Sequence, residues 1–263
     1  MELTVITICL NPGELIARTS ASVAAQDHQG LRWIVIDGGS RDGTVERLMA
    51  ENRKPDVLIS EPDRGIADAF NKGLANATGD AVWFMNAGDE FAGRDSVSAL
   101  LASWDRSRYR WITGAAEVVG EDGQLLFVRG WDRQPRNPRS LVRWNCSLMH
   151  QAVLAERSLF TELGGFDEAF RIAMDYELWL RWIGRGIAPQ TSDRVVCRFH
   201  RGGASGDPRR NNREDRRARA KHGLGNGMIL ESGLTALAWT KACIRGRYGR
   251  WAYRLKERLG VRI

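Results

Sequence analysis

The sequence predicts an α/β fold in which helices cover both faces of a mostly parallel sheet. Short apolar runs alternate with helix-like segments through the first hundred residues, and four of these runs end in turn-forming residues. Such alternation favours strand–helix–strand units and parallel strands. The chain of 263 residues is 43% hydrophobic and 27% charged. This composition fits a globular protein and argues against disordered, collagen-like and fibrous classes.

The expected elements follow one another without an internal repeat. The first strand stops at Asn11-Pro12-Gly13, a breaker before the first helix. In chain order we expect strand 3–10, helix 14–25, strand 31–36, helix 45–52, strand 57–60, helix 65–77 and strand 81–85.

Residues beyond 100 are less regular. A Pro- and Arg-rich loop spans 129–143, and a clear helical pattern returns at 175–183. We expect 202–216 to be a mobile polar connector and 224–263 to form one or two basic amphipathic helices. The chain therefore divides into a body, 1–203, and an extension, 204–263.

Charge is distributed unevenly between these parts. The net formal charge is +7, but residues 197–263 hold 17 Lys and Arg against 5 Asp and Glu, a balance of +12. Residues 1–196 hold the other 22 basic and 27 acidic residues, a balance of −5. A basic tail favours a nucleic acid or an anionic lipid surface as partner, or it is only a solvated segment.

Cysteine usage and hydropathy predict a cytoplasmic protein. The four cysteines lie far apart without a CxxC pair, which argues against a zinc ribbon or a disulfide framework. The first residues enter an apolar run without a basic segment or cleavage site, so we expect no signal peptide. No stretch reaches the ~18–20 apolar residues of a spanning helix.

Polar clusters follow the predicted strands, where ligands bind in such sheets. Asp37 and the glycines after it favour contact with a base or ribose, whereas Asp42 and Thr44 fit helix N-caps equally well. Arg64 precedes a helix whose free amides favour a phosphate. The alternative for Arg64 is a solvated charged loop.

The turn 86–89, Asn-Ala-Gly-Asp, closes the fourth strand. A carboxylate at a central strand tip is well placed to hold Mg²⁺ or Mn²⁺ together with a diphosphate. The alternative is an ordinary turn from strand to loop.

The helix at 175–183 has an apolar stripe made by Leu178, Trp179, Trp182 and Ile183. Asp175 falls on the same inward side, where a carboxylate is either an N-cap or a general base in a cleft. Glu177 is expected to pair with Arg181 at i+4 in an outward surface bridge.

Three further polar residues are candidates for acceptor binding or for a metal shell: His150, Gln151 and His200. Lone histidines are more often hydrogen-bonded structural residues. With four histidines and no HxH or HExxH pattern, a zinc site built from histidine is not expected.

In their order, these segments resemble glycosyltransferase family 2 with a GT-A fold, a Rossmann-like fold of nucleotide-diphospho-sugar transferases. The similarity covers roughly 2–203 and is closest to bacterial enzymes that build exopolysaccharide units or decorate glycolipids. Its segments are 34–44 (IVIDGGSRDGT), 60–73 (SEPDRGIADAFNKG), 77–80 (ATGD), 84–89 (FMNAGD), 150–151 (HQ), 163–167 (LGGFD) and 175–181 (DYELWLR).

The resemblance implies a metal-dependent, inverting transfer from a nucleotide-sugar. It divides the body into a nucleotide-sugar half, about 1–100, and an acceptor half, about 100–203. Asp175 would be the catalytic base, and Asp89 would bind Mn²⁺ or Mg²⁺. The residues implied to bind the nucleotide-sugar are Asn11, Asp37, Ser40, Arg64, Lys72, Asn86 and Ala87.

The chain departs from the family in two places. Many relatives have two adjacent acids where this chain has Gly88-Asp89, so metal binding depends on Asp89 alone. The QxxRW sequence of processive synthases is absent, which favours the addition of a single sugar to a glycan or lipid-linked acceptor.

The basic tail suits a helix on an anionic membrane, because 241–262 interleaves eight basic residues with Trp, Tyr and Leu. This predicts an enzyme attached to the inner face of the plasma membrane. Other functions are a nucleotidyltransferase of similar fold, a donor-binding protein without catalysis, or a nucleic-acid-binding protein. The acidic body argues against the last of these.

Overall fold

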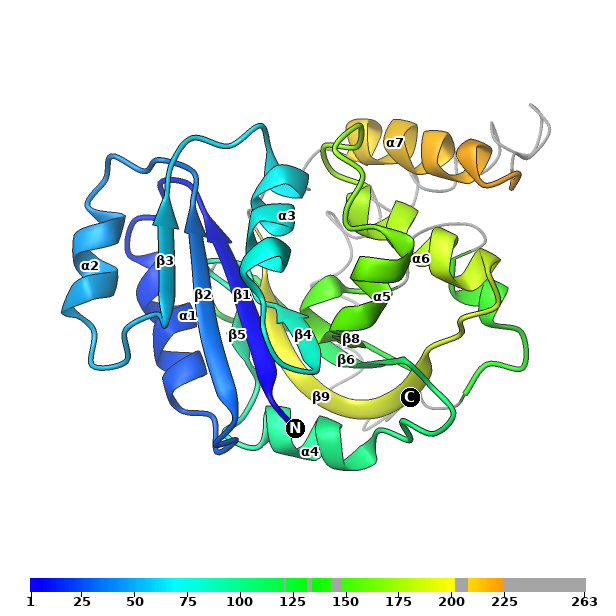
Figure 1. Ribbon diagram of the computed structural model, residues 1–263, viewed down its shortest axis with the longest axis horizontal. Helices are drawn as coiled ribbons and strands as arrows, with labels where there is room; N and C mark the ends of the chain where they lie inside the picture. The colour runs from blue at the N-terminus through cyan, green and yellow to red at the C-terminus, as the bar shows by residue number, and fades with distance from the viewer. Residues whose placement is uncertain (121, 132–133, 143–147, 202–207, 225–263) are drawn as a thin grey trace.

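The sheet predicted for the first hundred residues continues through the second half of the body. The computed structural model describes residues 1–120, 122–131, 134–142, 148–201 and 208–224, and Figure 1 shows helices on both faces of the sheet. Within these residues, nine strands lie in the order β3-β2-β1-β4-β8-β6-β9-β5, with β7 paired to β6.

The strands are β1 (Leu3–Cys9), β2 (Leu31–Asp37), β3 (Val57–Ser60), β4 (Ala81–Phe84), β5 (Glu90–Phe91), β6 (Trp111–Val119), β7 (Leu125–Arg129), β8 (Val153–Glu156) and β9 (Gln190–His200). The α-helices are α1 (Leu15–Ala24), α2 (Thr44–Ala50), α3 (Ile66–Asn76), α4 (Ser96–Ser103), α5 (Arg157–Leu163), α6 (Met174–Gly184) and α7 (Pro208–Lys221). Two short 3₁₀ turns, η1 (Pro138–Leu141) and η2 (His150–Ala152), lie in the second half.

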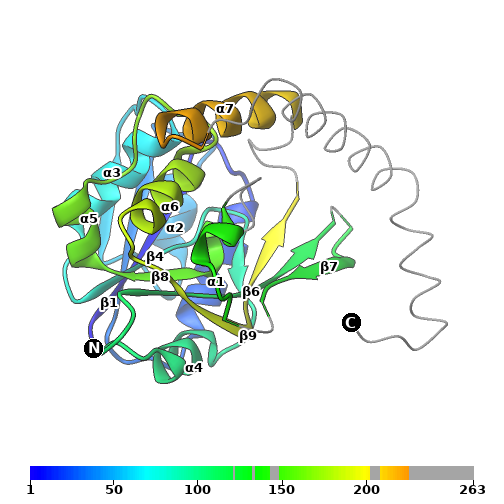
Figure 2. The same ribbon diagram turned by 90° about the vertical axis from the view of Figure 1, so that its right-hand side faces the viewer.

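The first half of the sheet is parallel, as predicted. β1 pairs in parallel with β2 and β4, and β2 pairs in parallel with β3. In the second half, β8 pairs antiparallel with β4 and β6, whereas β9 runs parallel to β6 and antiparallel to β5. Figure 2 shows the β6–β7 hairpin extending away from the helices. The result is a mixed sheet whose first half is parallel.

Side-chain alternation in β1 directs residues to two hydrophobic clusters. Leu3 and Val5 belong to the cluster that also contains buried residues of α1, α2 and α4. Ile6 and Ile8 belong to the other, which contains buried residues of α3, α5 and α6. Because successive residues of a strand point to opposite faces, both faces are covered by helices and the strand ends remain for polar loops.

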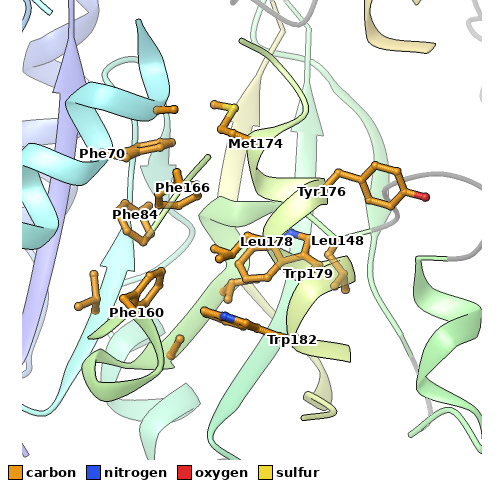
Figure 3. Packing of buried hydrophobic residues seen from close by; sticks show 14 of the residues in the cluster. Phe70, Phe84, Leu148, Phe160, Phe166, Met174, Tyr176, Leu178, Trp179 and Trp182 are labelled. Atoms are coloured by element: carbon orange, nitrogen blue, oxygen red, sulfur yellow. The ribbon is translucent and has the colours of Figure 1, made fainter. Parts of the chain in front are cut away.

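Aromatic packing fixes α6 against the sheet (Figure 3). The Trp111 ring is stacked on Trp179 with 5.0 Å between centroids and meets Trp182 edge-on at 5.2 Å. Phe160 of α5 packs edge-on against Trp182 at 5.1 Å. These contacts confirm the predicted inward stripe and hold the middle and end of α6 against the sheet.

Two expectations are wrong. The Glu177–Arg181 pair forms at 2.8 Å, but Glu177 is fully buried rather than on an outward surface. Residues 208–216 belong to α7 rather than to a mobile connector. The helix α7 accounts for both differences. Residues 208–216 form its first part, and it packs on α6 over the side that carries Glu177.

Helices were predicted over 224–263, and all of this segment except residue 224 lies outside the described residues. Among the residues that are described, no helix combines the length and apolar character that a membrane crossing requires.

Candidate active site

The loops that follow β1 and β2 are fastened to each other. The Asn11 backbone N–H donates to Ser40 Oγ at 2.7 Å, and Asn11 Oδ1 accepts from the Arg41 N–H at 2.8 Å. The Gly13 N–H donates to Asp42 Oδ2 at 2.7 Å. Asn11 has a φ of 47°, a left-handed conformation that asparagine tolerates better than most residues. The loops form a rigid rim at the ligand-binding edge of the sheet.

Asp37 lies at the end of β2 and organises this rim. Its fully buried carboxylate accepts hydrogen bonds from the Ser40 N–H at 3.0 Å, the Ser40 hydroxyl and the Ser60 hydroxyl at 2.6 Å. Burial opposes the charge of Asp37, but the hydrogen bonds outweigh it, so the pKa lies below its ordinary value. Contact of Asp37 with a nucleobase stays a prediction.

Arg64 lies just before α3 and Lys72 lies within it, and the two side chains have different partners. The Arg64 guanidinium pairs with Asp68 and Glu168, each at 2.9 Å, while its side chain stays 74% exposed. Lys72 Nζ lies 2.8 Å from Glu61 and donates to the Pro62 carbonyl at 2.9 Å. Lys72 therefore fastens the loop after β3, whereas Arg64 is accessible to a phosphate.

Asp89 is held at the turn after β4. It is 4% exposed, and its carboxylate accepts from Gln151 Nε2 at 2.7 Å and from the His200 N–H at 3.0 Å. Burial raises the pKa of Asp89 to about 6, and the hydrogen bonds from Gln151 and His200 oppose this rise only in part. The His200 ring lies instead 3.1 Å from Glu90, so His200 contacts Asp89 through its backbone.

His150 connects the turn after β4 to α6. Asn86 Nδ2 lies 3.0 Å from His150 Nε2, and His150 Nδ1 lies 3.5 Å from Asp175 Oδ2. When the Asn86 amide donates to Nε2, the ring proton is on Nδ1 and faces Asp175. Asp89 and Asp175 therefore contact adjacent residues, Gln151 and His150, within one connected network.

The residues at this turn fit a hard divalent cation. Asn86 Oδ1 is buried and has no hydrogen-bond partner in the described part of the chain, and each Asp89 oxygen accepts only one of the two bonds it can take. Oxygen donors suit Mg²⁺ and Mn²⁺. No three His, Cys, Asp or Glu side chains of the described residues group around one point, so a diphosphate and water would complete the coordination.

Sequence analysis missed α7, which brings further acids to the start of α6. Glu214 accepts from the backbone N–H groups of 171, 172 and 173 at 3.0, 2.7 and 3.0 Å. Burial and then the charge of Asp175 raise the pKa of Asp215 to about 7. One sequence signal could have predicted this helix. Glu214, Ala218 and Lys221 have i, i+4, i+7 spacing, which places them on one helical face.

A mixed sheet of this order with helices on both faces is the fold class of GT-A glycosyltransferases. The family model described as glycosyl transferase family 2 matches residues 4–160, and the chain belongs to this family. The predictions of a GT-A fold and of a glycosyltransferase are therefore confirmed, and the nucleotidyltransferase and non-catalytic alternatives are set aside.

Two relatives show how far the similarity extends. An uncharacterised glycosyltransferase of Mycobacterium tuberculosis is 37% identical over 201 residues, which cover 74% of each chain. A PGL/p-HBAD biosynthesis glycosyltransferase of Mycobacterium bovis is 25% identical over 184 residues, which cover 68% of each chain.

Solved structures with the same fold have lower identity. Staphylococcus aureus TarS in complex with UDP-GlcNAc has a TM-score of 0.63 at 16% identity, covering 94% of this chain and 75% of that one. The mannosyltransferase PcManGT from Pyrobaculum calidifontis, in complex with GDP-Man and Mn²⁺, has a TM-score of 0.61 at 20% identity, covering 98% and 80%. At these identities the likeness shows the fold.

Proposed function

We propose that this enzyme transfers one sugar, with inversion, from a nucleotide-diphospho-sugar to a hydroxyl of a lipid-linked or polysaccharide-precursor acceptor. The observation that carries the proposal is the network in which Asp175 and Asp89 contact the adjacent residues His150 and Gln151. Complexes of structural neighbours with UDP-GlcNAc and with GDP-Man support a nucleotide-sugar donor.

Asp175 acts as the general base in this proposal. Its Oδ1 accepts from the Tyr176 N–H at 2.7 Å, and Oδ2 faces His150 Nδ1, so the carboxylate is oriented on both sides. Asp175 takes the proton of the acceptor hydroxyl as the hydroxyl oxygen bonds to the anomeric carbon. The bond from that carbon to the diphosphate breaks on the opposite face, which inverts the configuration.

Asn86 and Asp89 would hold Mn²⁺ or Mg²⁺, which when bound stabilises the negative charge of the departing nucleoside diphosphate. Arg64 supplies a further cation, because its exposed guanidinium lies just before α3, whose N-cap Gly65 has no side chain to cap the first amides. Asp68 and Glu168 keep that guanidinium in place.

The test of the base is Asp175→Asn. We expect transfer to fall ~10²–10⁴-fold, the usual contribution of general-base catalysis, while the nucleotide-sugar still raises the melting temperature with Mn²⁺ present. Asp193→Asn, an exposed aspartate on β9, is the matched control and should leave transfer unchanged. Near-normal turnover of Asp175→Asn would show that Asp175 is not the base.

A thermal-shift panel identifies the donor. Full-length protein is measured with UDP- and GDP-linked sugars, each with Mn²⁺ and with chelator. We expect one donor to raise the melting temperature and the chelator to reduce that rise. A donor shift that is the same in chelator would contradict metal-assisted donor binding.

For location, we propose a cytoplasmic enzyme attached peripherally to the inner face of the plasma membrane by its basic tail. The charge balance of +12 over residues 197–263 supports this attachment. A lipid-linked acceptor would make the attachment useful, because the acceptor stays in the same membrane.

A further inference from the structure

A second site lies on α6, away from the catalytic network. A cavity of about 480 Å³ opens between the end of α6, the end of α7 and η1. Its lining from α6 includes Glu177, Leu180, Arg181 and Gly184, which share one helical face because they are three and four residues apart. At 3.6 residues per turn this face is opposite that of Asp175.

The lining is strongly basic. Among the described lining residues, Glu177 is the acidic one. Five are basic: Arg139, Arg181, Arg185, Lys221 and His222. Glu177 is fully buried and lies 2.8 Å from Arg181, 2.7 Å from Lys221 and 2.9 Å from His222. Burial alone would raise its pKa, but these partners keep it below the ordinary value.

Two of the five basic side chains are not among the ion-pair partners of Glu177. Arg139 and Arg185 are exposed and form no ion pair within the part of the chain that the structure describes. They come from η1 and from the end of α6, so they lie on two different walls of the cavity. Guanidinium groups bind phosphate oxygens strongly and with defined geometry.

The same cavity has an apolar wall. Leu224, which follows α7 and is half-buried, lines it together with the almost fully buried Val142, Leu180 and Ile183 behind. A free phosphate would leave this wall unused. A phosphate attached to a hydrocarbon chain would use both the cations and the apolar wall.

We propose that this cavity binds the phosphate headgroup of an anionic lipid, with Arg139 and Arg185 on the phosphate and the first lipid carbons against the half-buried Leu224. Leu224 lines the cavity immediately before the basic segment 225–263. The site therefore adds a specific lipid contact to the general electrostatic attraction of the tail, and the enzyme gains a defined orientation on a membrane.

The experiment uses a soluble probe, dihexanoyl phosphatidic acid below its micelle concentration, with the full-length protein. We expect saturable binding, measured by calorimetry, that weakens at least tenfold in the double variant Arg139→Glu/Arg185→Glu. Gly184→Phe should weaken binding similarly, because a Cβ at Gly184 meets no atom within 4 Å and a larger side chain there can enter the cavity. Arg94→Glu, at an exposed arginine near α4, is the matched control and should bind normally.

Several results would overturn the proposal. Wild-type affinity in both cavity variants would place the lipid elsewhere. If inorganic phosphate binds with the same affinity as the lipid probe, the cavity is a general anion site. If dihexanoyl phosphatidylcholine binds with the same affinity, the net charge of the lipid does not determine binding. The melting-temperature rise with donor and Mn²⁺, measured on the same variants, reports the catalytic site separately. A failure here therefore leaves the transferase proposal standing.

Discussion

Two adjacent side chains, His150 and Gln151, connect the two carboxylates of the candidate active site. His150 faces Asp175 at 3.5 Å, and Gln151 donates to Asp89 at 2.7 Å. Neither His150 nor Gln151 needs to react in the proposed step. In that step they would hold the proposed base and the proposed metal-binding carboxylate in a fixed relation, which transfer between two bound substrates requires.

His150→Ala tests this positioning role. We expect kcat to fall ~10–100-fold, because a small displacement of Asp175 is costly to the reaction, while KM for the donor changes little. His150→Gln, which can still donate a hydrogen bond, should recover part of the loss. Steady-state kinetics separate kcat from KM, and an unchanged kcat in His150→Ala would contradict the role.

The pKa of Asp89, raised to about 6 by burial, predicts how metal binding depends on pH. Asp89 is protonated below this value, and a proton on the carboxylate competes with the cation. The apparent affinity for Mn²⁺ in the presence of nucleoside diphosphate should therefore weaken by about tenfold per pH unit below 6 and level off above 7. Calorimetry between pH 5 and 8 measures it. An affinity that stays constant from pH 5 to 6 would show that Asp89 is not a ligand.

At the scale of single elements, α7 positions the start of α6. Glu214 accepts from three successive backbone N–H groups before α6, and Lys221 pairs with Asp167 at 2.8 Å and with Glu177 at 2.7 Å. The contacts made by the middle and by the last residue of α7 involve α6 or the loop before it. The helix therefore fixes the loop that leads into the first turn of α6, which carries Asp175.

Glu214→Ala should loosen this arrangement. Hydrogen bonds to a charged acceptor contribute ~1.5–3 kcal/mol, so we expect a loss of about 2–3 kcal/mol of stability and faster amide exchange in 171–175 and 208–221. Arg213→Ala, at an exposed position of α7, is the control. Hydrogen exchange followed by mass spectrometry makes the comparison. Equal exchange in both variants would mean that Glu214 does not hold α7.

The elements also show what the sequence could predict. Local periodicity predicted the parallel strands β1 to β4 correctly, because each is short, apolar and bounded by turn residues. It did not predict β6 and β8, because these strands pair with partners that are distant in the chain. α7 was missed because its composition is strongly polar, and its omission made Glu177 look exposed. The position of Asp175 was predicted because the tryptophan stripe of α6 fixes that face.

At the scale of the whole molecule, an acidic body is joined to a basic extension, and α7 shows that the extension begins inside the fold. The candidate catalytic residues come from the strand ends, η2 and α6, whereas the basic cavity lies where α7 ends. Catalysis and lipid contact would thus be separate along α6. With this separation, the proposed membrane attachment should be removable without a change in the chemistry.

Deletion of residues 225–263 tests that separation. Each basic residue near an anionic surface contributes ~1 kcal/mol, and the deleted segment holds eight of them between 241 and 262. We expect the full chain to float with vesicles containing phosphatidylglycerol at low salt and to dissociate at high salt, because salt screens the attraction. The truncated chain should float poorly yet keep the donor-induced rise in melting temperature. Equal flotation of both chains would show that the tail does not attach the enzyme to membranes.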